Sequence, residues 1–203
     1  MITNLFPITV FRSKVLENEK IKEICLPFVE EEYEKEPSTF TGYQDSDVFT
    51  TFDKDFDFPW EEVLNQFVPN IEEMCGEYGI KGQVGINTAW FNAFKSGQFH
   101  STHDHLPASF SAVYYLKYDP EIHTPTIFLN PYRQVSLFTA PDRDRDPSIS
   151  PPMWTGLSAL PVEEGDLVIF PGFLEHKVPR QTSDELRVTL SFNFNLYETS
   201  KSY

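Results

Sequence analysis

From Gln83 to Tyr197 the sequence alternates between short apolar runs and turns, and this pattern restricts the fold more than any other feature. The runs are rich in Phe, Tyr, Val and Thr, and turns such as Lys95-Ser96-Gly97 and Glu164-Gly165-Asp166 separate them. No amphipathic helix pattern lies between the runs. The expected strands are Val84 to Ala93, Phe110 to Tyr118, Thr126 to Leu129, Leu167 to Phe170 and Val188 to Tyr197. We therefore expect an antiparallel sandwich or jelly roll.

Two helical segments precede these strands. Asn18 to Lys35 carries apolar residues at helical spacing, with Pro27 as a candidate kink, and Trp60 to Tyr78 repeats the pattern. Gly79 stands where a helix C-cap is expected. Pro69 is expected to bend the second helix rather than end it. Both helices should pack on one outer face of the sheet.

The chain length favours a single domain. With 203 residues, of which 40% are hydrophobic, the chain can bury one substantial core. We expect a mainly β (α+β) fold, in which residues 1–80 form a helical apron and residues 81–200 a double-stranded β-helix. Pro37 to Pro59 has no helical period and should be extended or looped. Asn130 to Leu160 is crowded with Pro, Asp and Arg and predicts a long surface loop, of the kind that can serve as an active-site lid.

The charge pattern argues against nucleic acid as a partner. The chain has 31 acidic and 16 basic residues, a net charge of −15, and no basic cluster that would follow a phosphate backbone. No run approaches the roughly 18 apolar residues that cross a bilayer, and the opening residues do not resemble a signal peptide. We therefore expect a protein of the cytoplasm, or of the host cytoplasm if it is viral, without membrane contact. Cys25 and Cys75 fall on apolar helix faces and predict free thiols.

The histidines suggest a metal site. His100, His103 and His105 lie within six residues. In an extended strand, side chains at i and i+2 point to the same face, so His103 and His105 would project together and Asp104 away from them. Imidazole binds Fe, Zn, Cu and Ni, and a facial ligand set with open positions is typical of non-haem iron oxygenases. His176 is the candidate third ligand. Alternatively, each histidine is a polar residue bonded to solvent or to a backbone carbonyl.

Arg187 indicates a bound anion. It lies in the run ELRVTLSFNFNLY, inside the last expected strand. A buried Arg in an apolar strand is costly unless it meets an anion, and its planar fork suits a carboxylate. Thr189 shares its strand face, so the two residues are candidates to hold the far carboxylate of a dicarboxylic acid. The alternative is an ion pair between Arg187 and Asp184 or Glu185 at the strand end.

These residues together resemble those of the iron(II)- and 2-oxoglutarate-dependent oxygenases, in particular a prolyl-hydroxylase-like branch common in phage and bacterial genomes. The resemblance covers most of the chain. It begins weakly with LFPITVF and is specific in the blocks WFNAFKSGQFHSTHDHLPASFSAVYYL, EEGDLVIFPGFLEHKVP and ELRVTLSFN, in that order. It implies a hydroxylase that uses Fe(II), 2-oxoglutarate and O2, with 2-oxoglutarate decarboxylated to succinate.

The resemblance also implies roles for single residues. His103 and His176 match metal ligands, and Arg187 matches the salt-bridge partner of 2-oxoglutarate. Most of the superfamily carries His-x-Asp, whereas this chain and the branch it resembles carry His-x-His. His105 is therefore the expected second ligand, and Asp104 could serve only if the backbone bulges. A neutral imidazole in place of a carboxylate leaves the metal centre one unit more positive.

Further residues are implied in the pocket. Tyr115 matches a tyrosine that hydrogen-bonds the same 2-oxoglutarate carboxylate, provided that it faces inward and Tyr114 faces the other layer. Otherwise Tyr115 is a core aromatic. Asn92 matches an asparagine of the family and is expected to line the pocket, unless it only forms a turn. Trp90 and Phe94 share its parity and should build the wall.

The remaining histidines are not expected to bind the metal. His100 is expected at the surface, although it lies near enough in sequence to reach the metal or a substrate. His123 follows the turn Asp119-Pro120-Glu121 and is expected to be a solvated loop residue.

Two other functions fit part of the pattern. A cupin-like metalloprotein dioxygenase would use the same barrel and three histidines without 2-oxoglutarate, but it would not need an inward Arg187. A non-enzymatic jelly-roll binding or structural module would bind no stoichiometric iron. The primary substrate is open. An acidic surface at the pocket mouth would favour a basic peptide or protein over an anionic metabolite.

Overall fold

A computed structural model describes residues 7–38, 45–132 and 157–197, and its strands form two antiparallel sheets. The larger sheet contains, in order, β1 (Phe11–Lys14), β8 (Asp166–Pro171), β5 (Phe110–Lys117), β10 (Arg187–Tyr197), β3 (Gln83–Phe94) and β2 (Phe49–Thr50). The smaller contains β4 (His100–His103), β9 (His176–Val178), β6 (Ile127–Leu129) and β7 (Leu157–Ala159). Neighbouring strands come from distant parts of the chain, as in the expected jelly roll.

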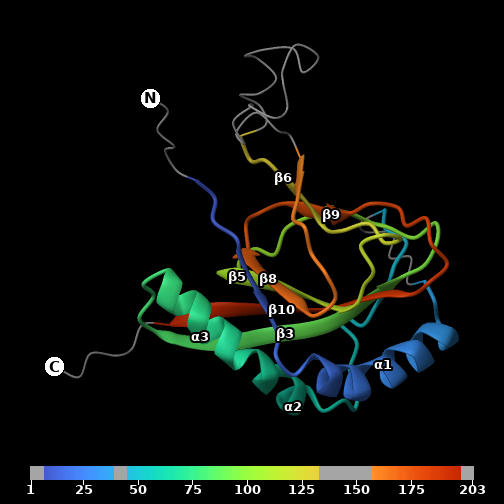
Figure 1. Cartoon of the computed structure of the whole chain (residues 1–203), viewed down its shortest axis with the longest axis horizontal. Helices are drawn as coiled ribbons and strands as arrows, with labels where there is room; N and C mark the ends of the chain where they lie inside the picture. The colour runs from blue at the N-terminus through green and yellow to red at the C-terminus, as the bar shows by residue number, and fades with distance from the viewer. Residues whose placement is uncertain (1–6, 39–44, 133–156, 198–203) are drawn as a thin grey trace, which may run out of the picture.

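The helices cover the face of the larger sheet that is turned away from the smaller sheet. Figure 1 shows them along β3 and β10, with β6 and β9 on the opposite side. The first helix, α1, spans Asn18–Lys35 as predicted. None of the helices in the described part of the chain is long and apolar enough to cross a membrane.

The second predicted helix is interrupted. Instead of one bent helix, the chain forms α2 (Trp60–Leu64), a 3-10 turn η1 (Asn65–Phe67) and α3 (Val68–Glu77). Proline lacks an N–H and is tolerated in the first turn of a helix, and Pro69 occupies that position in α3. The prediction that Pro69 only bends the helix was therefore wrong. Gly79 adopts a φ of +66°, as a C-terminal glycine should.

Alternation along the central strands divides the core in two. On β5, Tyr114 joins the cluster between helices and sheet, whereas Val113 and Tyr115 join the cluster between the two sheets. The expected inward orientation of Tyr115 is thus confirmed. Cys25 is buried, Cys75 is partly buried, and both are free thiols as predicted.

Short strands account for most of the differences from the sequence prediction. β1, β2 and β9 were not expected, because two to four residues are too few to show an alternating pattern. β7 lies inside the expected loop and pairs with β6, with Leu129 opposite Leu157. Residues 133–156 of that loop lie outside the described residues, so its role as a lid stays a prediction.

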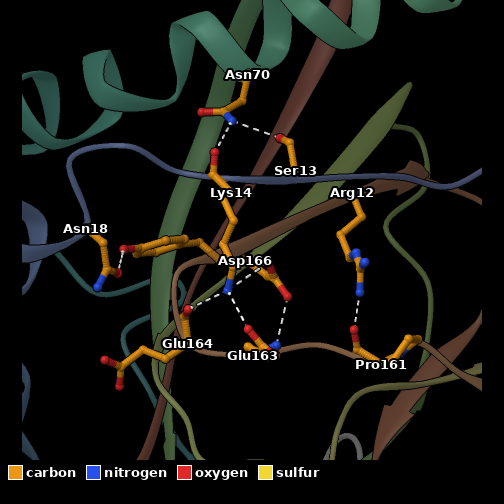
Figure 2. Close-up of polar contacts among 10 residues, drawn as sticks. Arg12, Ser13, Lys14, Asn18, Asn70, Pro161, Glu163, Glu164 and Asp166 are labelled. Carbon is orange, nitrogen blue, oxygen red and sulfur yellow. Dashed lines mark hydrogen bonds and ion pairs between the residues drawn. The ribbon is translucent and has the colours of Figure 1, made fainter.

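A polar cluster connects β1, an edge strand of the larger sheet, to the segment before β8 and to α3 (Figure 2). The Lys14 ammonium lies 3.2 Å from Asp166 Oδ1 and 2.9 Å from the carbonyl oxygen of Glu164. On the helical side, Asn70 Nδ2 donates to Ser13 Oγ at 2.8 Å and to the carbonyl of Lys14 at 2.9 Å. Asn70 is 7% exposed, so water does not replace these bonds. One amide therefore joins α3 to the first strand.

Replacing Asn70 with alanine should destabilise the fold by about 1 to 3 kcal/mol, because a part-buried carbonyl and a hydroxyl lose their donor. Urea unfolding followed by circular dichroism measures the difference. The matched control is Asn87→Ala, since Asn87 is exposed and makes one contact of 3.4 Å with Tyr197 Oη. The control should change stability by less than about 0.5 kcal/mol. Equal stability of the two variants would contradict this stabilising role of Asn70.

Candidate active site

Three histidine side chains converge between the two sheets. His103 ends β4, His176 begins β9, and the two residues lie opposite each other in the antiparallel pair. His105 follows β4, and its Nε2 lies 3.2 Å from Nε2 of His176. The possible ligand atoms of the three residues lie within 4.8 Å of one another. One metal ion can reach all three, so the structure brings together the residues selected from the sequence.

A turn, rather than a shared strand face, directs His105 to the site. β4 ends at His103, so the expectation that His103 and His105 lie on one strand face was wrong. Instead, the backbone N–H of His105 donates to the carbonyl of Gly172 at 2.8 Å. Asp104 is exposed, and its Oδ1 accepts the N–H of Leu106 at 3.1 Å. The aspartate therefore stabilises the turn and lies outside the group of three.

Backbone carbonyls fix two of the rings in a ligand-ready form. Nδ1 of His103 lies 2.8 Å from the carbonyl oxygen of Ser101, and Nδ1 of His176 lies 3.0 Å from that of Leu174. Because a carbonyl only accepts, each Nδ1 carries the proton and donates it. Nε2 is then unprotonated, and its lone pair is available to a metal ion.

Burial keeps these imidazoles neutral. It lowers the pKa of His105 to about 3, and the neighbouring His103 adds to the effect. Burial likewise lowers the pKa of His103 and takes that of His176 well below its usual value. Neutral imidazole is the form that binds metals, so the folded protein presents that form even at mildly acidic pH.

Arg187 is a fully buried cation at the start of β10. Its guanidinium carbon lies 5.1, 5.6 and 5.7 Å from the ring centroids of Phe94, Tyr115 and Tyr118. Nε donates to the carbonyl of Thr124 at 3.1 Å. The two terminal nitrogens have no hydrogen-bonding partner.

Burying a guanidinium with unpaired donors costs free energy, and a bound anion would complete its hydrogen bonds. The alternative expected from the sequence, an ion pair with Asp184 or Glu185, does not occur among the described residues. A planar carboxylate matches the two unpaired nitrogens of Arg187.

A pocket between the sheets contains the histidines and reaches Thr189, two residues from Arg187 on β10, although Arg187 itself does not line it. Its lining residues are Trp90, Asn92, His100, His103, His105, Val113, Thr126, His176, Val178, Thr189 and Ser191. Thr189 lies directly opposite Asn92 on one side and Tyr115 on the other. Asn92 Oδ1 is buried without a partner, and Tyr115 Oη accepts the N–H of Thr126 at 3.4 Å. Asn92 and Trp90 thus line the pocket as expected, whereas Phe94 lies against the guanidinium.

Two histidines differ from their predicted positions. His100 was expected at the surface, but it lines the pocket and its ring stacks on that of His103 at 4.0 Å. His123 was expected to be solvated, but it is 6% exposed. Its Nε2 donates to the carbonyl of Glu185 at 3.1 Å, and its Nδ1 accepts the N–H of Asp119 at 3.0 Å. Neither environment has a local sequence signal, because the contacts come from distant segments or from the geometry of a turn.

A family model for 2OG-Fe(II) oxygenases matches residues 88–193, which is more than half of the chain. The matched segment begins before Trp90 and ends after Arg187, so it includes the three converging histidines. No curated protein matches the sequence.

Several solved structures share the fold. A prolyl-4-hydroxylase from Pseudomonas putida is 13% identical with a TM-score of 0.57, and 94% of each chain is covered. The epimerase SnoN, in complex with Fe3+, alpha ketoglutarate and nogalamycin RO, is 12% identical with a TM-score of 0.62, over 96% of this chain and 83% of that one. An oxidoreductase of the 2OG-Fe(II) oxygenase family from Burkholderia pseudomallei is 12% identical with a TM-score of 0.48, and the match covers 70% of this chain and 60% of that one. The first two show that this fold is shared with a prolyl-4-hydroxylase and with an epimerase.

The metal-free protein should lose stability in acid. Burial lowers the pKa of His100 and of His105 to about 3, against about 6.5 in an unfolded chain, so protons favour the unfolded state. The stabilisation is complete above about pH 6.5 and is lost as the pH falls toward 3. His100→Phe removes one titrating group. The stability of this variant should therefore fall less steeply with decreasing pH than that of the unaltered protein, and the two slopes should differ by up to about 1.4 kcal/mol per pH unit.

Urea unfolding with a chelator present, at several pH values between about 7 and 5, measures both slopes. Carboxylates titrate equally in the two proteins and cancel in the comparison. Parallel stability curves would show that His100 is not held neutral in the folded state.

Proposed function

The chain belongs to the 2OG-Fe(II) oxygenase family, and from this we propose that it hydroxylates a C–H bond of its substrate with residues of the pocket described above. Fe(II) would be held by His103, His105 and His176, and 2-oxoglutarate would be bound by Arg187. The observation that carries this assignment is the buried guanidinium with two unpaired nitrogens, in the same barrel as three converging imidazoles.

The donor set fits iron. Three neutral nitrogens on one side leave further coordination positions open, which is the arrangement that non-haem iron oxygenases use. Bound Fe(II) supplies the redox chemistry that couples O2, the conversion of 2-oxoglutarate to succinate and CO2, and the hydroxylation of the substrate. The carbonyls of Ser101 and Leu174 keep two of the rings in the required tautomer.

The far end of the pocket fits a dicarboxylic acid. The two terminal nitrogens of Arg187 would donate to its distal carboxylate in a bidentate pair, with Tyr115 and Thr189 as adjacent hydroxyl donors. The rings around the guanidinium exclude water, which strengthens this contact. Asn92 lines the pocket, and its Nδ2 would donate to the part of the co-substrate nearer the metal.

The structure favours this function over the two alternatives. A cupin-like dioxygenase that does without 2-oxoglutarate gives no reason for a buried cation with unpaired nitrogens. A binding or structural module gives no reason to hold four histidines around one pocket and to keep them neutral.

We also propose that the protein works in the cytoplasm. Cys25 and Cys75 are free thiols, which suits a reducing compartment. Fractionation of producing cells checks this, and recovery outside the cytoplasm would contradict it.

Arg187→Gln should weaken 2-oxoglutarate binding by roughly 30-fold to 1,000-fold, because a buried hydrogen-bonded charge pair contributes about 2 to 4 kcal/mol. Anaerobic titration of the Fe(II)-loaded protein with 2-oxoglutarate, followed by the metal-to-ligand charge-transfer absorption, gives the dissociation constant. Iron affinity without 2-oxoglutarate serves as the control and should change little. Unchanged 2-oxoglutarate binding in the variant would overturn the assignment of Arg187.

The second metal ligand can be identified with two neighbouring variants. His105→Ala should lower Fe(II) affinity at least about tenfold, since one of three nitrogen ligands is lost. Asp104→Ala should leave iron affinity within about twofold, because its carboxylate bonds the Leu106 N–H and lies outside the histidine group. Anaerobic competition with a coloured chelator measures both. The reverse result would make Asp104 the ligand.

A further inference from the structure

The inner face of the larger sheet carries a polar pair that the proposed function does not use. Along β10, Thr189 and Ser191 line the pocket, and Asn193 is the next residue of the same face. Ser111 of β5 lies directly opposite Asn193. Ser111 is fully buried, and neither its Oγ nor Asn193 Oδ1 has a hydrogen-bonding partner.

This pair lies beyond the histidines, on the side away from Arg187. Ser191 pairs with Trp90, whose ring contacts that of His105 at a centroid distance of 5.4 Å. Asn193 is two residues farther along β10 than Ser191, a step of about 7 Å in a strand. Arg187 and the polar pair therefore lie on opposite sides of the level of His105 along β10.

The strand beside Asn193 is exposed to solvent at this level, although neither Ser111 nor Asn193 is among the residues that line the pocket. Thr88, which pairs with Asn193 on β3, is exposed. Two exposed apolar side chains, Phe52 at 43% and Leu106 at 64%, lie next to residues that line the pocket. Phe52 packs edge-on against Trp90, and Leu106 follows His105 in the chain.

We infer that Ser111 and Asn193 form a substrate subsite that binds an uncharged carboxamide and discriminates against charged groups. This inference rests on the proposed function, whose substrate it characterises. A buried amide and hydroxyl without partners are costly, and a ligand amide satisfies both because it donates and accepts. The exposed Phe52 and Leu106 suit an apolar group beside that amide.

The pocket has no counter-ion for a charged substrate. None of its lining residues, all within the described part of the chain, is an Asp, Glu, Lys or Arg. The acidic surface that would favour a basic substrate thus does not extend into the pocket. A buried ammonium or carboxylate without a partner is strongly disfavoured, whereas a carboxamide is not.

Three small probes of one skeleton test the subsite: N-acetyl-leucinamide, which is neutral, N-acetyl-leucine, which is anionic, and leucinamide, which is cationic. Calorimetric titration of the anaerobic protein loaded with Fe(II) and 2-oxoglutarate gives their affinities. The neutral probe should bind at least about tenfold more tightly than either charged probe. Equal affinities, tighter binding of a charged probe, or no binding of the neutral probe would overturn the inference.

Variants locate the subsite. Ser111→Ala and Asn193→Ala should each weaken the neutral probe about three- to tenfold, the equivalent of one hydrogen bond. Asn193→Asp keeps the shape and adds a charge, so it should shift the preference toward leucinamide. Asn87→Ala, an exposed position on the neighbouring strand β3, is the control and should change nothing. If Ser111→Ala does not weaken the neutral probe and Asn193→Asp does not shift the preference toward leucinamide, the subsite is not there.

The dissociation constant of 2-oxoglutarate, measured in the same preparations, distinguishes a failure of the proposed function from a failure of the subsite inference. It should be unchanged in Ser111→Ala and Asn193→Ala, because both residues lie away from Arg187. If the unaltered protein fails to bind iron and 2-oxoglutarate, the proposed function is wrong and the inference falls with it. If it binds both but does not distinguish the probes, only the inference fails.

Discussion

The register of β10 is the constraint on which the core and the site both depend. The strand pairs with β3 on one side and with β5 on the other, so its neighbours hold its alternation in place. Phe192 and Phe194 face the helices, whereas Arg187, Thr189 and Ser191 face the second sheet. A slip of one residue would bury the polar set under the helices and open the phenylalanines to the pocket. Forming the helix-side core therefore also aligns the guanidinium.

The polar face of β10 is held by buried hydrogen bonds that water does not readily replace. Thr124, whose carbonyl accepts the Arg187 Nε–H, is itself fixed by Gln181, whose Oε1 accepts the Thr124 N–H at 3.1 Å. Gln181 is 2% exposed and also donates to the carbonyl of Pro179 at 3.0 Å. These bonds orient a cation whose remaining nitrogens stay unpaired. The unpaired nitrogens lower the stability of the fold, and the apolar core on the helix side offsets this cost, as is common for proteins with binding sites.

Sequence reasoning succeeded where one segment contains its own signal. The helix Asn18–Lys35 and the longer strands were predictable, because several turns or alternations repeat within each. It failed where the determining contact is distant. The orientation of His105 depends on the carbonyl of Gly172, and the burial of His123 depends on that of Glu185. Neither of these hydrogen bonds can be predicted from the hydropathy pattern. The residues of the site were nevertheless identifiable, since imidazole and guanidinium are rare in such strands.

The charge balance of the site connects its two unusual features. With three imidazoles as ligands, Fe(II) and Arg187 would contribute three positive charges, and 2-oxoglutarate two negative ones. A carboxylate ligand would neutralise the remainder, but His105 stands where that carboxylate is usual. The loaded pocket would therefore keep one net positive charge in a poorly hydrated space, which repels a cation. An anion would be attracted to the metal side, yet it would find no donor cation at the Ser111–Asn193 pair. A neutral amide avoids both penalties, so the missing carboxylate and the uncharged subsite favour the same substrate chemistry.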